Sequence, residues 1–568
     1  MILLWQCIPN FLEALLIYWY FCDRMKRAKS KAYTYEDAYM ASYMWQMKDR
    51  LYSHETSQIE SSDTHQDACL ASSPPSSGKL CGKLKTDNNH MNTKQTDLTQ
   101  GPILRHLFKL AIPTIGASFM QMTYNLTDMV WLGRLGEDAV AAVGAAGFFV
   151  WFGISLLLIP RIGAEVGVSQ SKGRRDQSAI LSFVHHALFW ALLLSVVYTL
   201  IILFFAPHLI DFFRIDSLMV NSEAVGYLRL VGFGFVFNFM NPTFAGVYNG
   251  LGNSRLPFYY LTVGVVLNLV FDPLFIFGLG PVPAMGVKGA ALATVLSQVV
   301  VWLIFFFRMV VAQELVELKL QQIRISRFIS WKLFKLGVPV AAESALFASF
   351  AMVLTRMIAV FGPVPIAVQS IGAQIEALSW MTASGFATAL GSFTGQNFGA
   401  RQWNRIWKGY KMTLVIGTVL GLTVTLLFVI GGRFIFSLFL NEAGSLRLGV
   451  LYLQILAISQ VFMIYEITTR GAFNGLGLTI PPSLTGIVFT GLRIPFASLL
   501  IARTSLGLLS IWWAITLSSV VKGLVLPVWF ILVLRNREIA LDNLPGRKLI
   551  SLIPSRIRQQ FFIKSDPQ

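Results

Sequence analysis

Apolar residues occur in long runs from residue 107 onward, and short polar segments separate these runs. Each run is about the length that an α-helix needs to cross a bilayer, roughly 20 residues. Twelve runs form two groups of six, which predicts an all-α integral membrane protein with twelve transmembrane helices. The first group covers residues 107–131, 139–163, 179–205, 223–247, 256–279 and 287–311. The second covers residues 333–360, 366–394, 409–431, 448–470, 481–502 and 508–534.

The two groups of six are versions of one another. Gln170 follows Pro113 at the same interval at which Gln396 follows Pro339, and the surrounding segments 165–174 and 392–401 are similar. The sequence Asn-Gly-Leu-Gly at 249–252 recurs at 474–477. Such repetition indicates a duplicated membrane unit, which is typical of transporters. Because each repeat has an even number of crossings, both repeats should share one orientation, related by an axis along the membrane normal.

Composition agrees with a membrane protein: 55% of the residues are hydrophobic, 13% are charged, and the mean hydropathy is +0.60. The net charge of +17 is concentrated in the loops after the second, sixth, eighth and twelfth crossings. Basic loops mark the cytoplasmic side. We therefore predict a multi-pass protein of the cell (inner or plasma) membrane with both termini in the cytoplasm. Anionic lipid headgroups explain the basic charge, and no nucleic-acid partner is expected.

The first hundred residues differ from the rest of the chain. They contain all four cysteines and a Ser/Thr/Asp/Gln-rich tract at 52–100 without hydrophobic periodicity. This composition predicts disorder, and translation from Met91 would make residues 1–90 a non-native extension. The predicted domains are this extension (1–100), an N-lobe (101–312), an amphipathic cytoplasmic linker (313–332), a C-lobe (333–535) and a basic cytoplasmic tail (536–568).

Ionisable side chains inside the crossings are candidates for function, because an unpaired charge in the hydrocarbon core is strongly unfavourable. The acids are Asp128, Asp272, Glu343, Glu376 and Glu466, and the bases are Arg356, Arg493 and Lys522. This surplus of acids can bind a cation. For the second half, a structural role is an equal alternative, in which Glu343 or Glu466 forms a buried ion pair with Arg356 or Arg493.

The first half is more specific, because it has two intramembrane acids and no intramembrane base is predicted there. Asn268 lies four residues before Asp272, so the two side chains share one helix face. Pro273 follows the acid and can free a backbone carbonyl. Together with Asp128 and a hydroxyl such as Thr294, these oxygen atoms suit a small cation. The same carboxylates could instead carry protons, and the residues leave both ions open.

These residues and their order give the chain a clear family resemblance. It resembles the multidrug and toxic compound extrusion (MATE) family, and within it the prokaryotic DinF-like branch. The similarity covers residues 101–535. It rests on Ala-Ile-Pro at 111–113, Tyr-Asn-Leu-Thr-Asp at 124–128, Met-Gly-Val-Lys-Gly-Ala-Ala-Leu-Ala-Thr at 285–294 and Gly-Gln-Asn-Phe-Gly-Ala at 395–400.

The resemblance implies two six-helix lobes around a central cleft, and export of amphipathic, often cationic, drugs against inward H⁺ or Na⁺. It implies no cofactor beyond that ion and no enzymatic activity. We further predict a monomer in the lipid bilayer. The first helix would bend at Pro113. The N-lobe cation site would be lined by Tyr124, Asp128, Asn268, Asp272 and Thr294. Candidates for a second coupling site in the C-lobe are Glu343, Glu466 and Glu376.

Three other functions fit the residues less well. A flippase for lipid-linked precursors would need several cationic residues for a pyrophosphate group, whereas the first half offers carboxylates. An intramembrane enzyme would need a catalytic constellation, and the only histidines within a crossing, His185 and His186, are adjacent and so point to different helix faces. A channel fits duplicated, proline-interrupted repeats less well than a transporter does.

Overall fold

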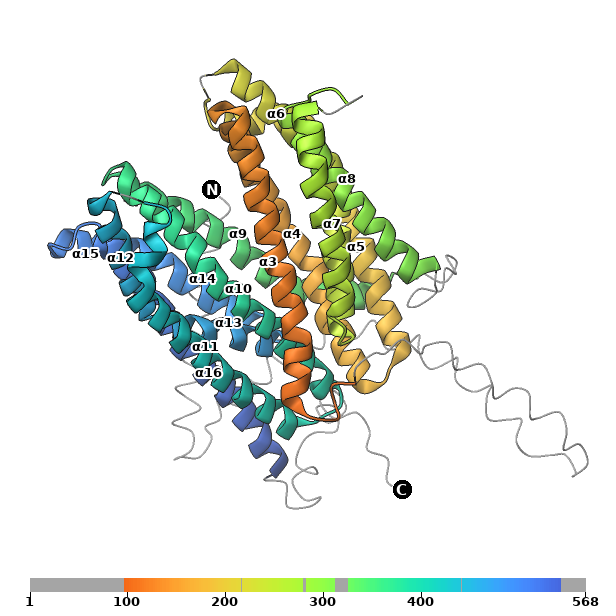
Figure 1. Ribbon diagram of the computed structural model, residues 1–568. Coiled ribbons are helices and arrows are strands. Elements are labelled where there is room, and N and C mark those ends of the chain that lie inside the picture. The colour runs from red at the N-terminus through yellow and green to blue at the C-terminus, as the bar shows by residue number, and fades with distance from the viewer. Residues whose placement is uncertain (1–96, 216, 279–281, 312–324, 441, 543–568) are drawn as a thin grey trace, which may run out of the picture. The chain divides into compact units, whose positions relative to one another are not determined.

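The protein is described by a computed structural model that covers residues 97–215, 217–278, 282–311, 325–440 and 442–542. The described residues form helices joined by short loops (Figure 1). The N-lobe consists of α3 (Ile103–Leu135), α4 (Glu137–Arg174), α5 (Gln177–Asp211), α6 (Leu218–Gly250), α7 (Arg255–Pro273) with the π-helical turn η1 (Leu274–Gly278), and α8 (Val287–Phe306) with η2 (Phe307–Val311).

The C-lobe repeats this series. It consists of α9 (Arg327–Ala359), α10 (Pro363–Gly399), α11 (Trp403–Ser437), α12 (Ala443–Ala457) with α13 (Gln460–Gly475), α14 (Ile480–Gly491) with α15 (Arg493–Arg503), and α16 (Leu509–Asp542). Helices α12 and α13 together correspond to one predicted run, with an angle of 52° at the break between them. Each of the twelve predicted apolar runs therefore corresponds to one helical segment, which confirms the predicted fold class.

Two of these segments are less apolar than the others. Within the described ranges, nine helices, or ten with the bent pair, are long and apolar enough to cross a membrane. The remaining two, α3 and α10, contact one another, and α10 also contacts α4. These helices carry more polar side chains, and the polar residues of α3 include the candidate Tyr124 and Asp128. The most polar crossings thus lie where the lobes meet.

The duplication is visible in the backbone. Loops in the same place in each lobe have residues with positive φ: Gly136 (127°) and Gly362 (103°) precede the second helix of each lobe, and Arg175 (60°) and Arg401 (58°) follow it. Non-glycine residues rarely adopt positive φ. The same unusual positive φ angles at equivalent positions confirm that the two halves are copies of one unit.

Loops between the helices begin and end with specific contacts. Asp176 caps α5, because its carboxylate accepts hydrogen bonds from the Ala179 N–H (2.9 Å) and the Ser178 hydroxyl (2.7 Å). These bonds lower the pKa of Asp176, a loop residue outside the membrane-spanning segments.

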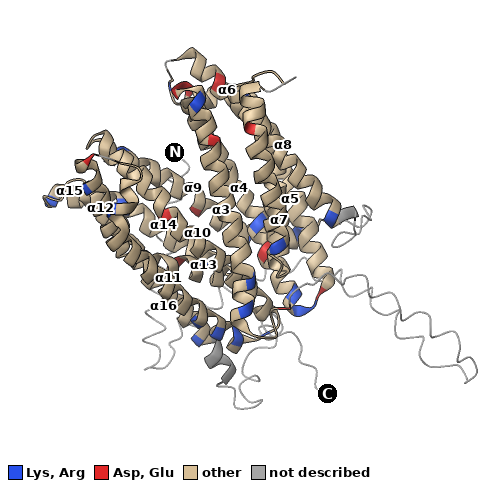
Figure 2. Cartoon of the chain, viewed as in Figure 1, with Lys and Arg blue, Asp and Glu red and all other residues tan. Residues whose placement is uncertain are grey.

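Figure 2 shows Lys and Arg gathered at the end of the bundle where α3 begins and α16 ends.

Three domain boundaries differ from the prediction. Residues 97–100, assigned to the N-terminal extension, belong to the fold, because Leu98 is fully buried and Arg405 donates to the Leu98 carbonyl (3.2 Å). Helix α9 starts at Arg327, within the predicted linker, and α16 continues to Asp542, within the predicted tail. Helices extend past the apolar runs because polar residues remain helical outside the hydrocarbon core. The rest of the extension, including Met91, and most of the linker lie outside the described residues.

Candidate functional site

The candidate N-lobe site is formed by α3, α7 and α8. Tyr124 of α3 and Thr294 of α8 share a hydrogen bond of 2.8 Å between their hydroxyl oxygens. On α7, the Asn268 amide donates to the Asp272 carboxylate at 3.0 Å, and both side chains are buried. The helical spacing predicted this last contact. The structure therefore brings together predicted residues that are far apart in the sequence.

Both acids of this site have an oxygen without a partner. Asp128 Oδ1 and Asp272 Oδ2 are buried and accept no hydrogen bond from any described residue. The two carboxylates are close enough for an electrostatic interaction with each other and with the phenol of Tyr227 on α6. A buried carboxylate without a partner is strongly unfavourable when ionised. A proton or a bound cation would remove this unfavourable charge.

The backbone beside Asp272 is irregular, as Pro273 predicted. Helix α7 ends at Pro273, and the π-helical turn η1 follows directly. Proline has no N–H, so it cannot donate to the carbonyl one turn earlier. Single π-helical turns inside helices are frequent at functional sites. The first helix behaves differently: α3 continues as one helix through Pro113, where the Thr114 hydroxyl donates to the Leu110 carbonyl (2.9 Å).

The prediction that the first half has no base within a crossing is wrong. Arg161 lies inside α4 and Arg229 inside α6. The runs were identified by average apolarity, which hides single charges near their ends, where long basic side chains reach the headgroups. Arg161 interacts with Glu165, a buried acid one turn later that was not counted among the intramembrane acids. In the ranges the structure covers, neither arginine forms an ion pair with Asp128 or Asp272.

The C-lobe acids, in contrast, lie beside bases, although the Oε2 atom of Glu343 is also buried without a hydrogen-bond partner among the described residues. Arg470 of α13 contacts Glu343 of α9 at 2.7 Å and Glu466 at 2.9 Å. Glu466 also pairs with Lys522 of α16 at 3.0 Å. Arg493 interacts with Glu376 and donates to Ser518 (2.6 Å) and Ser519 (3.1 Å). Three acids and three bases form this cluster, so it carries no surplus charge.

The ion-pair alternative for the C-lobe is thus correct in kind, and Arg493 interacts with Glu466 as expected, but the direct partners are Arg470 and Lys522. Arg356, proposed as a partner, is exposed on α9. Arg470, which takes its place, was not counted as intramembrane, because it is the last residue of the predicted run 448–470. Its position four residues after Glu466 is the signal that could have identified it, since such residues are neighbours on a helix.

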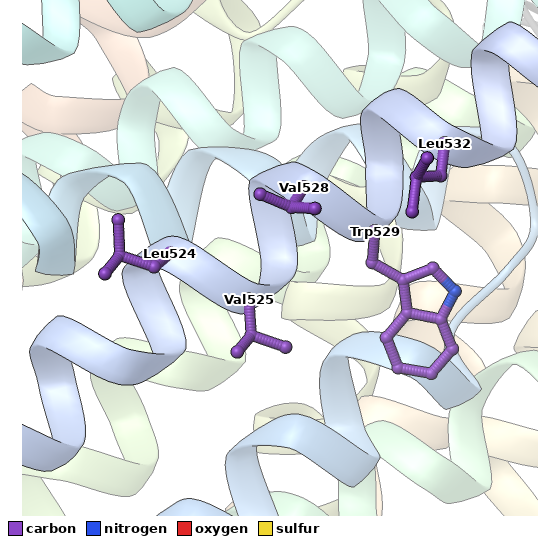
Figure 3. Close-up of a pocket in the computed structure, with 5 residues that line it drawn as sticks. All are labelled: Leu524, Val525, Val528, Trp529 and Leu532. Atoms are coloured by element: carbon purple, nitrogen blue, oxygen red, sulfur yellow. The ribbon is translucent and has the colours of Figure 1, made fainter. Parts of the chain in front are cut away.

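The surface depression on α16 is apolar and does not provide a cation site. A depression of about 400 Å³ is lined by five residues of α16, none of them ionisable (Figure 3): Leu524, Val525, Val528, Trp529 and Leu532. No group of three or more His, Cys, Asp or Glu side chains that could hold a metal ion occurs in the described part of the chain. A cation at the N-lobe site would need oxygen ligands from amide, hydroxyl or carbonyl groups in addition to the two carboxylates.

Comparison with known families places these features in context. A family model, MatE, matches residues 113–274 and 339–499, which together are more than half of the chain. Each match begins at one of the duplicated prolines. The chain belongs to the MatE family. Asp128 and Asp272 lie in the first matched segment, and the C-lobe charge cluster lies in the second except for Lys522.

Relatives and solved structures agree with this assignment. "Probable multidrug resistance protein NorM" of Thermotoga maritima is 25% identical over 411 residues, 72% of this chain and 88% of the relative. A structure described as the outward-facing conformation of a multidrug resistance MATE family transporter has a TM-score of 0.73 at 25% identity, covering 78% of this chain and 98% of that one. A MATE structure in the bent conformation has a TM-score of 0.74 at 26% identity, covering 79% and 99%.

Proposed function

We propose that this protein is a secondary active exporter of amphipathic, often cationic, organic compounds, driven by the inward movement of H⁺ or Na⁺. The observation that carries the proposal is the pair Asp128 and Asp272, two acids that each have a buried oxygen without a partner and that form no ion pair with a base of the described N-lobe residues. The multidrug resistance relatives and MATE transporter structures support the same function. An intramembrane enzyme or a channel has no comparable support.

The chemistry of the site explains how an ion could be exchanged for a drug. A carboxylate that is buried must be neutralised, by a proton or by a cation. Once neutralised, the N-lobe site is stable in a closed cleft, and once it loses the ion it favours contact with water or with a cationic substrate. Drug and ion would then bind alternately, as antiport requires. Reciprocal linkage means that each ligand would lower the affinity for the other by the same factor.

The coupling ion can be identified with the purified protein in liposomes. We expect export of a cationic fluorescent dye to be driven by an imposed proton gradient, an imposed sodium gradient, or both, and to cease when the gradients are collapsed. The initial rate of dye movement under each gradient is the measurement. Equal dye movement with and without both gradients would contradict a secondary active exporter.

We also propose that the protein resides in the cell (inner or plasma) membrane as a monomer, with both ends of the described chain on the cytoplasmic side. The basic loops between α4 and α5 and between α10 and α11 support this orientation. Asn404 at the start of α11 is exposed and belongs to the basic side, whereas Glu137 at the start of α4 is exposed on the other.

Single cysteines can test this orientation after serine has replaced Cys7, Cys22, Cys69 and Cys81, the four native cysteines. With an impermeant thiol reagent added to whole cells, Glu137→Cys should be labelled and Asn404→Cys should be protected. Breaking the cells open should make both react, which controls for folding. The reverse pattern in whole cells would place the basic loops outside and contradict the orientation.

A further inference from the structure

The repeated glutamines meet the repeated Asn-Gly-Leu-Gly segments across the boundary between the lobes. The Gln170 amide of α4 donates to the carbonyl of Gly475 at the end of α13, at 3.0 Å. The Gln396 amide of α10 donates to the carbonyl of Gly250 at the end of α6, also at 3.0 Å. Both glutamine side chains are buried. Each lobe thus caps the end of a helix in the other lobe.

The two bonds satisfy groups that a helix cannot satisfy alone. The last carbonyls of an α-helix have no partner within it, and Gly250 and Gly475 are the last residues of α6 and α13. A buried carbonyl left without a donor is unfavourable. Separation of the lobes at this end therefore requires either water at both carbonyls or the loss of two buried hydrogen bonds.

Glycines allow the lobes to approach closely around these bonds. A Cβ atom on Gly173 would overlap the carbonyl oxygen of Gln396, and one on Gly399 would overlap the carbonyl oxygen of Gln170. Only glycine permits backbones to come so near. Ser169 packs against Gly395 in the same layer and is buried. The backbones of the two lobes are therefore in close contact around both glutamines.

The start of each lobe also forms hydrogen bonds with the other lobe. The Leu98 N–H donates to the Gln396 side-chain oxygen at 3.1 Å. The oxygen and the nitrogen of the Gln396 side-chain amide therefore each form a hydrogen bond. In the other lobe, His186 of α5 accepts from the N–H of Ser326, which precedes α9, at 2.7 Å, and Trp190 donates to Ser330 at 3.0 Å. Separation of the lobes would therefore also have to break contacts at the starts of α3 and α9.

We propose that Gln170 and Gln396 form a crossed latch that closes the boundary between the lobes at the end where the chain enters and leaves the bundle. The latch rests on the proposed function, because only a transporter that alternates between two access states needs to open it. Packed interfaces of this kind have two discrete arrangements, formed and separated. Loss of the latch shifts the protein toward the state that is open at this end.

A buried reporter cysteine measures this opening. On the background without native cysteines, Ser169→Cys places a thiol beside Gly395, where N-ethylmaleimide can react only when the lobes separate. Adding Gln396→Leu removes the hydrogen bonds to both Leu98 and Gly250, so it should raise the labelling rate by more than the roughly fivefold effect of one buried hydrogen bond, and adding Gln170→Leu as well should raise it further. The matched control is Gln298→Leu, which removes the side-chain oxygen that accepts from Asn241 (2.8 Å) within the N-lobe and should not change the rate.

A second reporter separates opening from unfolding, and dye export separates the latch from the proposed function. Ser195→Cys lies buried inside the N-lobe and should remain unlabelled in every glutamine variant. Labelling of both reporters, or equal Ser169→Cys rates in Gln396→Leu and Gln298→Leu, would overturn the latch even if dye export is intact. Faster labelling of Ser169→Cys alone supports the latch, and the absence of gradient-driven export from the parent protein would then contradict only the proposed function.

Discussion

Replacing Asp272 with asparagine is expected to reduce gradient-driven export to the background rate of empty liposomes while the protein stays folded. Asparagine keeps the shape of the side chain and can still accept the 3.0 Å bond from Asn268. It removes the charge that must be neutralised, so the site no longer gains from binding a proton or a cation. The measurement is the initial rate of dye export under the driving gradient, together with size-exclusion chromatography of the variant.

The matched control is Asp211→Asn. Asp211 lies at the end of α5, is exposed, and accepts a hydrogen bond from Asn221 at 3.0 Å, so the same chemical change occurs outside the site. Its export should be unchanged, whereas Asp128→Asn should behave like Asp272→Asn. If both site variants export normally and Glu343→Gln does not, the coupling group lies in the C-lobe and the proposed assignment is wrong.

The helices could be predicted from the sequence because the bilayer imposes a simple rule. A crossing helix needs a long apolar run, and a run such as 139–163 lies within α4 even though the helix continues to Arg174. The ends were less predictable, since residues in the headgroup layer can be polar and helical at once. The break between α12 and α13, at an angle of 52°, also had no signal such as proline.

Contacts within one helix were accessible to sequence reasoning, and contacts between helices were not. The spacing of Asn268 and Asp272 predicts their hydrogen bond. The bond between Tyr124 and Thr294 joins residues 170 positions apart, and only the family resemblance pointed to both. Nothing in the sequence assigned Tyr227 to the site. Partners of this kind depend on the rotation of each helix about its axis, which packing determines.

The two lobes differ in whether bases lie beside their intramembrane acids. Positions opposite Asp128 and Asp272 in the repeat are Leu354 and Ala497, both buried. The C-lobe has instead gained acids together with bases that neutralise them. A neutralised cluster can stabilise the packing of α9, α13 and α16 without taking up an ion. We propose the acids of the N-lobe as the coupling site, and this difference between the lobes predicts different effects of mutation in each.

Lys522→Met should therefore act on stability, lowering the free energy of unfolding by about 3 kcal/mol, because removal of one member of a buried ion pair leaves its partner uncompensated. The Lys522 Nζ atom lies 3.0 Å from Glu466 Oε2, and the two side chains are only 7% and 6% exposed. The expected loss is at the low end for such pairs, because Arg470 still contacts Glu466 and would be shared with Glu343.

Thermal or denaturant unfolding in detergent measures this effect, and the exposed Lys408→Met on α11 is the matched control. The double variant Lys522→Met/Glu466→Gln should regain most of the lost stability, because it removes the uncompensated charge and leaves an amide of the same shape. Export by the double variant should persist if the C-lobe cluster is structural. Undiminished stability of Lys522→Met would mean that Glu466 readily takes up a proton in place of the lysine charge. That result would contradict a structural role for the Lys522–Glu466 ion pair.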